Sequence, residues 1–118
     1  MYCVTRSSKP SRRKRSSGEK DAFVCAFSSD GTALYSTYLG GSGNDEGQDS
    51  AVNALGNCYV VGSTQSPNFP AVNPIQGVYS GAGDAFVTVF AADGASLGFS
   101  TFLGGSGGAF AIAVGLDP

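Results

Sequence analysis

Apolar residues fill both sides of an extended chain at residues 21–27, DAFVCAF. Side chains alternate between the two faces of a β-strand, so this pattern predicts a strand covered by other layers on both faces. The SSDG sequence at residues 28–31 predicts a tight turn, because Asp-Gly readily adopts positive φ angles. Residues 34–39, rich in Tyr and Thr, predict a second strand.

Two further strands are predicted downstream. Residues 40–49 are rich in glycine and predict a loop, which is followed by a short strand around residues 50–53 and a turn at residues 55–57. Residues 58–64, CYVVGST, are rich in β-branched and aromatic residues and predict a fourth strand. Four strands with short turns predict one antiparallel meander. Such a sheet must bury two faces, as a blade of a β-propeller does between its neighbours.

The connection that follows is long and proline-rich. Residues 65–84 include Pro67, Pro70 and Pro74, which makes the segment incompatible with a helix. A connection of this length without structure of its own is uncommon, so it is expected to pack back onto the sheet. The apolar residues expected to make this contact are Phe69, Val72, Ile75, Val78 and Tyr79.

The chain then repeats itself. Residues 84–94, DAFVTVFAADG, match residues 21–31 with an offset of 63, and FSTFLGGSG at residues 99–107 matches YSTYLGGSG at residues 35–43. A long fixed period is typical of propellers, solenoids and arrays. We therefore expect an all-β fold of antiparallel four-stranded β-propeller blades, about one and a half of them. Residues 21–83 form the first repeat with its connection, and residues 84–118 form a second, truncated repeat.

Charge divides the chain near residue 21. All seven cations lie in residues 1–20, which carry +6 together with Glu19, whereas residues 21–118 carry −8 and contain no Lys, Arg or His. The basic segment lacks apolar periodicity and is expected to be a disordered tail. Phosphate backbones are bound chiefly by Lys and Arg, so the acidic body is a poor candidate for nucleic-acid binding, and the RRKR run at residues 12–15 is expected to be solvated.

Several other functional classes lack support in the sequence. No apolar stretch follows the basic N-terminus, so no secretory signal peptide is indicated, and no apolar run has the length of a membrane span. The GxSxG match at residues 104–108 predicts a glycine-rich turn, because a chain without His cannot form a Ser-His-Asp triad. The three cysteines, Cys3, Cys25 and Cys58, are expected to be buried free thiols rather than a zinc site or a disulfide framework.

One group of oxygen-bearing side chains is a candidate metal site. Asn44, Asp45, Glu46 and Asp49 lie within six residues of a glycine-rich segment, and Ca²⁺ prefers carboxylate and carbonyl oxygens. The alternative is a solvated acidic loop, which the second repeat supports because its matching loop has no acids. Other acids recur at equivalent positions, Asp21 with Asp84 and Asp30 with Asp93, where hydrogen bonding to turn backbone is expected rather than catalysis.

The succession of short motifs from residue 21 onward, DAFV, DG, YSTYLGGSG, NDEG, YVVGST, NFP, NPIQ and GAGDAFV, resembles the bacterial SBBP β-propeller repeat. The resemblance implies four-stranded blades in secreted or cell-surface proteins and no particular reaction. The basic tail has no counterpart in that repeat, and Asn68 stands where the repeat usually has Asp. One and a half blades cannot close a propeller, so the expected partners are further repeats of a parent chain or other copies of this one.

Three functional hypotheses follow from these features. The first is a non-enzymatic repeat module, a structural or interaction scaffold that is a fragment of a larger cell-surface or secreted protein. The second is a fragment of a propeller enzyme of the lyase or glycosidase type, with loop carboxylates around its central channel. The third is a non-functional gene remnant. No organic cofactor is indicated, and the sequence points to no specific ligand.

Overall fold

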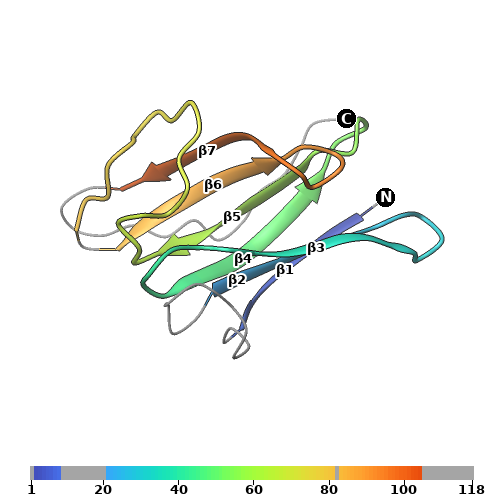
Figure 1. Ribbon diagram of the computed structural model, residues 1–118, viewed down its shortest axis with the longest axis horizontal. Coiled ribbons are helices and arrows are strands. Elements are labelled where there is room, and N and C mark those ends of the chain that lie inside the picture. The colour runs from blue at the N-terminus through green and yellow to red at the C-terminus, as the bar shows by residue number, and fades with distance from the viewer. Residues whose placement is uncertain (1, 9–20, 82, 105–118) are drawn as a thin grey trace.

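The computed structural model describes residues 2–8, 21–81 and 83–104, which contain β-strands and no helix (Figure 1). No helix in these residues is therefore long and apolar enough to cross a membrane. The expected all-β fold is confirmed. The strands are β1 (Tyr2–Ser8), β2 (Asp21–Phe27), β3 (Ala33–Leu39), β4 (Asp45–Val52), β5 (Cys58–Thr64), β6 (Asp84–Phe90) and β7 (Leu97–Leu103).

The strands form two antiparallel sheets. Sheet A has the order β1-β2-β3, and sheet B has the order β4-β5-β6-β7. The predicted meander of residues 21–64 is therefore wrong, because the chain changes sheets between β3 and β4. Instead of extending the edge of β3, β4 packs against β1, where the Ser50 hydroxyl donates a hydrogen bond to the Cys3 carbonyl oxygen over 2.8 Å. The four-stranded sheet combines the end of the first sequence repeat with the start of the second.

Strand β1 corrects the prediction for the N-terminal segment. Its residues were expected to belong to a disordered tail, but Tyr2–Ser8 pair along the whole of β2. The register shows why. Ser8 lies opposite Asp21 just as Thr64 lies opposite Asp84, and Tyr2 lies opposite Phe27 as Cys58 lies opposite Phe90. YCVTRSS thus takes the place in sheet A that CYVVGST takes in sheet B. Residues 9–20 of the predicted tail lie outside the described residues.

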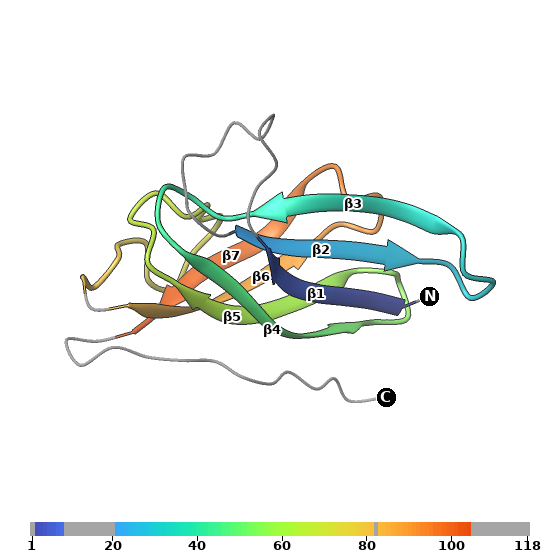
Figure 2. The same ribbon diagram turned by 90° about the horizontal axis from the view of Figure 1, so that it is seen from below.

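The two sheets pack face to face around one hydrophobic core. Ala22, Val24 and Leu39 of sheet A contact a cluster from sheet B and its connection. That cluster consists of Cys58, Val60, Phe69, Phe86, Phe90 and Phe102. Figure 2 shows the three strands of sheet A lying across those of sheet B. Burial of this apolar area supplies the main stabilising free energy, at about 25 cal/mol per Å².

The expectation of full coverage on both faces holds for only one face of β2. Ala22, Val24 and Ala26 are fully buried between the sheets, whereas Phe23 and Phe27 on the other face are partly exposed. Sheet B covers the inner face of sheet A. Among the described residues, no comparable layer covers its outer face. An apolar face is therefore left without a second sheet on it.

The connection between β5 and β6 folds back onto sheet B, as expected. Phe69 is buried, and Val72 pairs with Ser100 on the free edge of β7. Two residues predicted to make this contact do not: Ile75 is 80% exposed and Val78 is 76% exposed. Both residues lie beyond the single bridge at Val72, where backbone groups hold the segment: the Ile75 N–H donates to the Thr101 hydroxyl oxygen over 3.0 Å.

Candidate functional site

A buried carboxylate, Asp45, lies at the start of β4 and joins three segments of the chain. Its oxygens accept hydrogen bonds from the Thr64 hydroxyl at 2.5 Å, the Ser66 hydroxyl at 2.9 Å and the Gly41 N–H at 3.0 Å. Strand β4 begins at Asp45, five residues before the strand that was predicted around residues 50–53. Asp45 fixes the turn before β4 to the end of β5 and to the connection that follows.

The glycines of the repeated GGSG sequence make this junction possible. A Cβ atom on Gly40 would lie 2.4 Å from Asp45 Oδ2, and one on Gly41 would lie 2.2 Å from Asn68 Oδ1. The Asn68 oxygen accepts hydrogen bonds from the Ser42 N–H at 2.8 Å and the Ser42 hydroxyl at 3.2 Å. These positions require glycine because a Cβ atom there would collide with the side-chain oxygens of Asp45 and Asn68.

Burial is the main influence on the pKa of Asp45, and it raises that pKa because it disfavours the charged form. Hydrogen bonds from Thr64, Gly41 and Ser66 act in the opposite direction. The nearby carboxylate of Asp21 raises the pKa further through charge repulsion. A carboxyl group with its oxygens occupied in this way is suited to holding backbone in place.

Three of the four residues predicted to bind calcium lie on a strand rather than on a loop. Asp45, Glu46 and Asp49 all belong to β4, where neighbouring side chains point to opposite faces. Asn44 accepts a hydrogen bond at its backbone carbonyl from the Gln65 N–H over 2.8 Å. Across residues 2–8, 21–81 and 83–104, no three His, Cys, Asp or Glu side chains gather as metal ligands would. Strand geometry places the adjacent Asp45 and Glu46 on opposite faces, so these two side chains do not form one ligand set.

A second polar junction surrounds Asp84 at the start of β6. Its carboxylate accepts hydrogen bonds from the Ser80 N–H and the Gln76 side-chain amide, both at 2.9 Å, and from the Ser80 hydroxyl. The amide oxygen of Gln76 in turn accepts the Gly104 N–H at 3.0 Å. The predicted structural role of the recurring acids is confirmed here. It is confirmed also at Asp30 and Asp93, which accept backbone N–H groups two residues ahead.

Sequence reasoning missed Thr64, Ser66, Asn68 and Gln76, which complete these junctions. Three of them belong to a segment interpreted only as a proline-rich connection. The available signal was the alternation of small polar residues with proline directly after a strand, which is typical of turns that hydrogen-bond neighbouring backbone. The GxSxG match lies outside the described residues except for Gly104.

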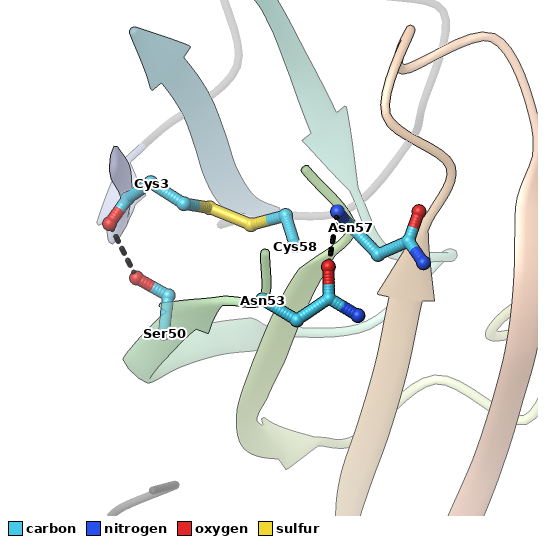
Figure 3. The surroundings of a disulfide bond; sticks show 5 residues. All are labelled: Cys3, Ser50, Asn53, Asn57 and Cys58. Carbon is cyan, nitrogen blue, oxygen red and sulfur yellow. Dashed lines mark hydrogen bonds between the residues drawn. A yellow bond between two sulfur atoms is a disulfide. The ribbon is translucent and has the colours of Figure 1, made fainter. Parts of the chain in front are cut away.

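A disulfide bond corrects the prediction of three free thiols. Cys3 in β1 and Cys58 in β5 are joined with their Cα atoms 6.2 Å apart (Figure 3), and Cys25 is free. A turn positions Cys58, since the Asn53 side-chain oxygen accepts the Asn57 N–H over 2.9 Å. The two cysteines lie 55 residues apart in sequence, so only the facing of the two sheets brings them together.

The two sheets also carry equivalent faces with opposite exposure. Val4 in β1 is the register counterpart of Val60 in β5, yet Val4 is 37% exposed and Val60 is fully buried. The reverse holds for Val24 in β2, which is fully buried, and its counterpart Val87 in β6, which is partly exposed. The face of sheet A that contains Val24 therefore packs on the face of sheet B that contains Val60. The two sheets face the same way, so the face of sheet A that contains Val4 and the face of sheet B that contains Val87 both remain open.

One comparison with known proteins finds a similar repeat in the chain. Residues 34–70 match the family model described as the SBBP β-propeller repeat. The matched segment runs from β3 through β4 and β5 to Phe69 and Pro70, and it includes the Asp45 junction. No curated protein matches the chain. Residues 34–70 are therefore similar to an SBBP-type β-propeller repeat.

Proposed function

We propose that this chain is a non-enzymatic β-propeller repeat module, a structural or interaction scaffold that packs against further repeats of the same kind. The observation that carries the proposal is the opposite exposure of Val4 and Val60, which occupy the same place in two stacked sheets. Sheet A covers the face of sheet B that contains Val60. A further sheet of the same type would cover Val4 in the same way.

The outer face of sheet B supports the same proposal from the other side. Val87 and Val89 are partly exposed there, and their counterparts in sheet A, Val24 and Ala26, are fully buried. The open face of sheet B is the counterpart of the buried face of sheet A, and the open face of sheet A is the counterpart of the buried face of sheet B. The two open faces are therefore of the same two kinds as the faces that pack between the sheets. Contacts of this head-to-tail kind propagate in one direction and close into a ring when the rotation permits.

The chemistry of the described carboxylates favours a structural role. Asp45 and Asp84 accept hydrogen bonds from hydroxyl, amide and backbone groups of their own chain. Such contacts hold turns and strand ends together, which is what a scaffold requires. We place no reaction at either junction.

We further propose that the module works in a secreted or cell-surface protein, within a larger assembly of repeats. The Cys3–Cys58 disulfide supports this location, because disulfides form and persist in oxidising compartments. The propeller repeat itself supports the assembly, since single repeat units bury their faces only by stacking on neighbours.

Sedimentation velocity with two complementary variants tests the packing. Val4→Asp disables the open face of sheet A, and Val87→Asp disables that of sheet B. The wild-type chain should self-associate with increasing concentration, whereas each variant alone should remain monomeric. An equal mixture should form a one-to-one dimer, because one intact face of each kind remains.

Ile75→Asp is the matched control, because Ile75 is exposed and apolar but lies on the connection rather than on either open face. This variant should associate like the wild type. A wild-type chain that stays monomeric at high concentration, or a mixture of the two variants that does not dimerise, would contradict head-to-tail packing.

A further inference from the structure

The connection of sheet B is held by a set of specific contacts. The ring of Phe69 lies 4.5 Å from the ring of Phe86 and 6.1 Å from that of Phe102, measured between centroids. Val72 exchanges two backbone hydrogen bonds of 2.9 Å with Ser100 on the edge of β7. The segment thus adds to the sheet edge while its phenylalanine packs on two aromatic rings of sheet B.

Gln76 completes the attachment seven residues after Phe69. Its side-chain amide donates a hydrogen bond to Asp84, and its backbone carbonyl accepts the Phe102 N–H over 3.2 Å. The Thr101 hydroxyl oxygen accepts the Gln76 N–H over 2.9 Å. An aromatic side chain, an edge-strand pairing and a glutamine together define how the segment is recognised.

Sheet A repeats the groups that receive this segment. The counterparts of Phe86, Phe102 and Ser100 are Phe23, Tyr38 and Ser36. Phe23 and Tyr38 form an edge-to-face pair with ring centroids 5.8 Å apart. The Thr37 hydroxyl donates to the Tyr38 carbonyl oxygen over 3.1 Å, as the Thr101 hydroxyl donates to that of Phe102 over 2.9 Å. The receiving surface is therefore duplicated in both side chains and backbone.

The matching ligand sequence is not duplicated. The connection between β1 and β2 covers residues 9–20, and its sequence KPSRRKRSSGEK contains neither an aromatic residue nor a glutamine. It therefore lacks the side chains that correspond to Phe69 and Gln76. Ser36, the counterpart of the residue that pairs with Val72, is exposed.

We propose that the edge of β3 and the aromatic pair of Phe23 and Tyr38 bind an extended segment of a partner protein. That segment carries Phe-Pro and a Gln seven residues after the Phe, as residues 69–76 of this chain do. It pairs with the Ser36 backbone and places its phenylalanine on Phe23. Addition of a strand at a sheet edge obtains affinity from backbone hydrogen bonds and specificity from side-chain contacts.

This binding is compatible with the stacking of further repeats and does not depend on it. In sheet B, Phe69 lies on Phe86 while sheet A covers the same face, so both covers are present together. Failure of self-association would leave peptide binding possible, and failure of peptide binding would leave stacking possible.

The test uses a fluorescent peptide of residues 66–80, SPNFPAVNPIQGVYS, titrated with the full chain and followed by anisotropy. Saturable binding is expected, with affinity about tenfold weaker for a peptide that has Phe69 replaced by Ala. Methylation of the Val72 amide nitrogen should weaken binding by a similar factor, because it removes the donor to the strand edge. Methylation of the Ala71 amide nitrogen is the matched control and should leave affinity unchanged.

A second arm locates the peptide on sheet A. Ser36→Pro removes an N–H at the sheet edge without breaking the ladder with β2, since edge strands tolerate proline, and it should abolish binding. Ser36→Ala keeps this N–H and should still bind, weakened only by the loss of a hydrogen bond equivalent to the one that the Ser100 hydroxyl donates to the Pro70 carbonyl oxygen over 2.7 Å. Absence of binding to the wild-type chain would overturn the proposal. Equal binding by the Phe69→Ala peptide or by a folded Ser36→Pro chain would also overturn it, the latter because the peptide would then lie on sheet B.

Discussion

Cys3 of β1 and Cys58 of β5 are covalently joined across the two sheets, with their Cα atoms 6.2 Å apart. This bond connects the N-terminal strand to the centre of sheet B. The place of this strand also depends on its pairing with β2 and on its packing against β4. The disulfide and the sheet contacts therefore support the same arrangement.

Removal of the disulfide should destabilise the fold. Closing a loop across a separation of 55 residues restricts the unfolded chain, and the chain-entropy argument gives an upper value of about 4 kcal/mol. Cys3→Ser should lower the urea midpoint, and dithiothreitol should lower that of the wild type to a similar value. Cys25→Ser is the matched control, because Cys25 is free. A wild-type midpoint unchanged by reductant would contradict the stabilising role of the bond.

Asp45 should make stability depend on pH. Its pKa in the folded state is raised above the ordinary value of 3.8, mainly by burial. The folded state therefore binds its proton more tightly than the unfolded state does. The resulting stabilisation is fully present below pH 3.8 and is lost as pH rises through the raised pKa. Urea unfolding at a series of pH values should show this decline in the wild type and a smaller one in Asp45→Asn.

Asp30 supplies a control of opposite sign. Hydrogen bonds, first from Ser28 and then from the Thr32 N–H, lower its pKa from 3.8 to about 2. Its contribution is present above pH 3.8 and is lost as pH falls toward 2. Asp30→Asn should therefore alter only the acid end of the profile. Identical pH profiles for Asp45→Asn and the wild type would refute the assignment of the decline to Asp45.

Phe69 should contribute more to stability than any exposed apolar residue of its segment. Truncation of a buried phenylalanine removes its apolar contacts and leaves a cavity, so Phe69→Ala should cost about 3–5 kcal/mol of unfolding free energy. Ile75→Ala in the same segment should change stability by less than about 0.5 kcal/mol, since Ile75 is exposed to solvent. Denaturant titrations of both variants give the comparison. Equal effects would show that the connection does not pack as described.

Close backbone approach at Gly40 should make this position intolerant of a side chain. The added Cβ of Gly40→Ala would lie 2.4 Å from Asp45 Oδ2, so the buried carboxylate must shift, at a cost of about 1–3 kcal/mol. Gly98→Ala is the control, because the nearest atom to its Cβ is 4.0 Å away. Thermal unfolding should separate the two variants by several degrees. A Gly40→Ala chain as stable as the wild type would contradict the tight junction.

Local patterns were sufficient to predict much of the secondary structure. The alternation at residues 21–27, the Asp-Gly turns and the β-branched run at residues 58–64 each depend on contacts between near neighbours, and the structure has strands or turns at all three. The repeat with offset 63 likewise indicated a propeller repeat, because self-similarity is a property of the sequence itself. The structural role of the acids at turns could be predicted for the same reason, since Asp30 bonds a backbone group only two residues away.

Pairing between distant segments was decided only by the tertiary structure. Residues 2–8 contain too little apolar periodicity to predict a strand, and they form one because β2 offers them a free edge. The Cys3–Cys58 bond joins segments that only the facing of the two sheets brings together. The Asp45 junction joins segments that only the GGSG turn brings together. The sequence determined which residues prefer extended structure and where the chain turns. Tertiary packing determined the grouping of strands into sheets, because that choice depends on which faces can bury one another.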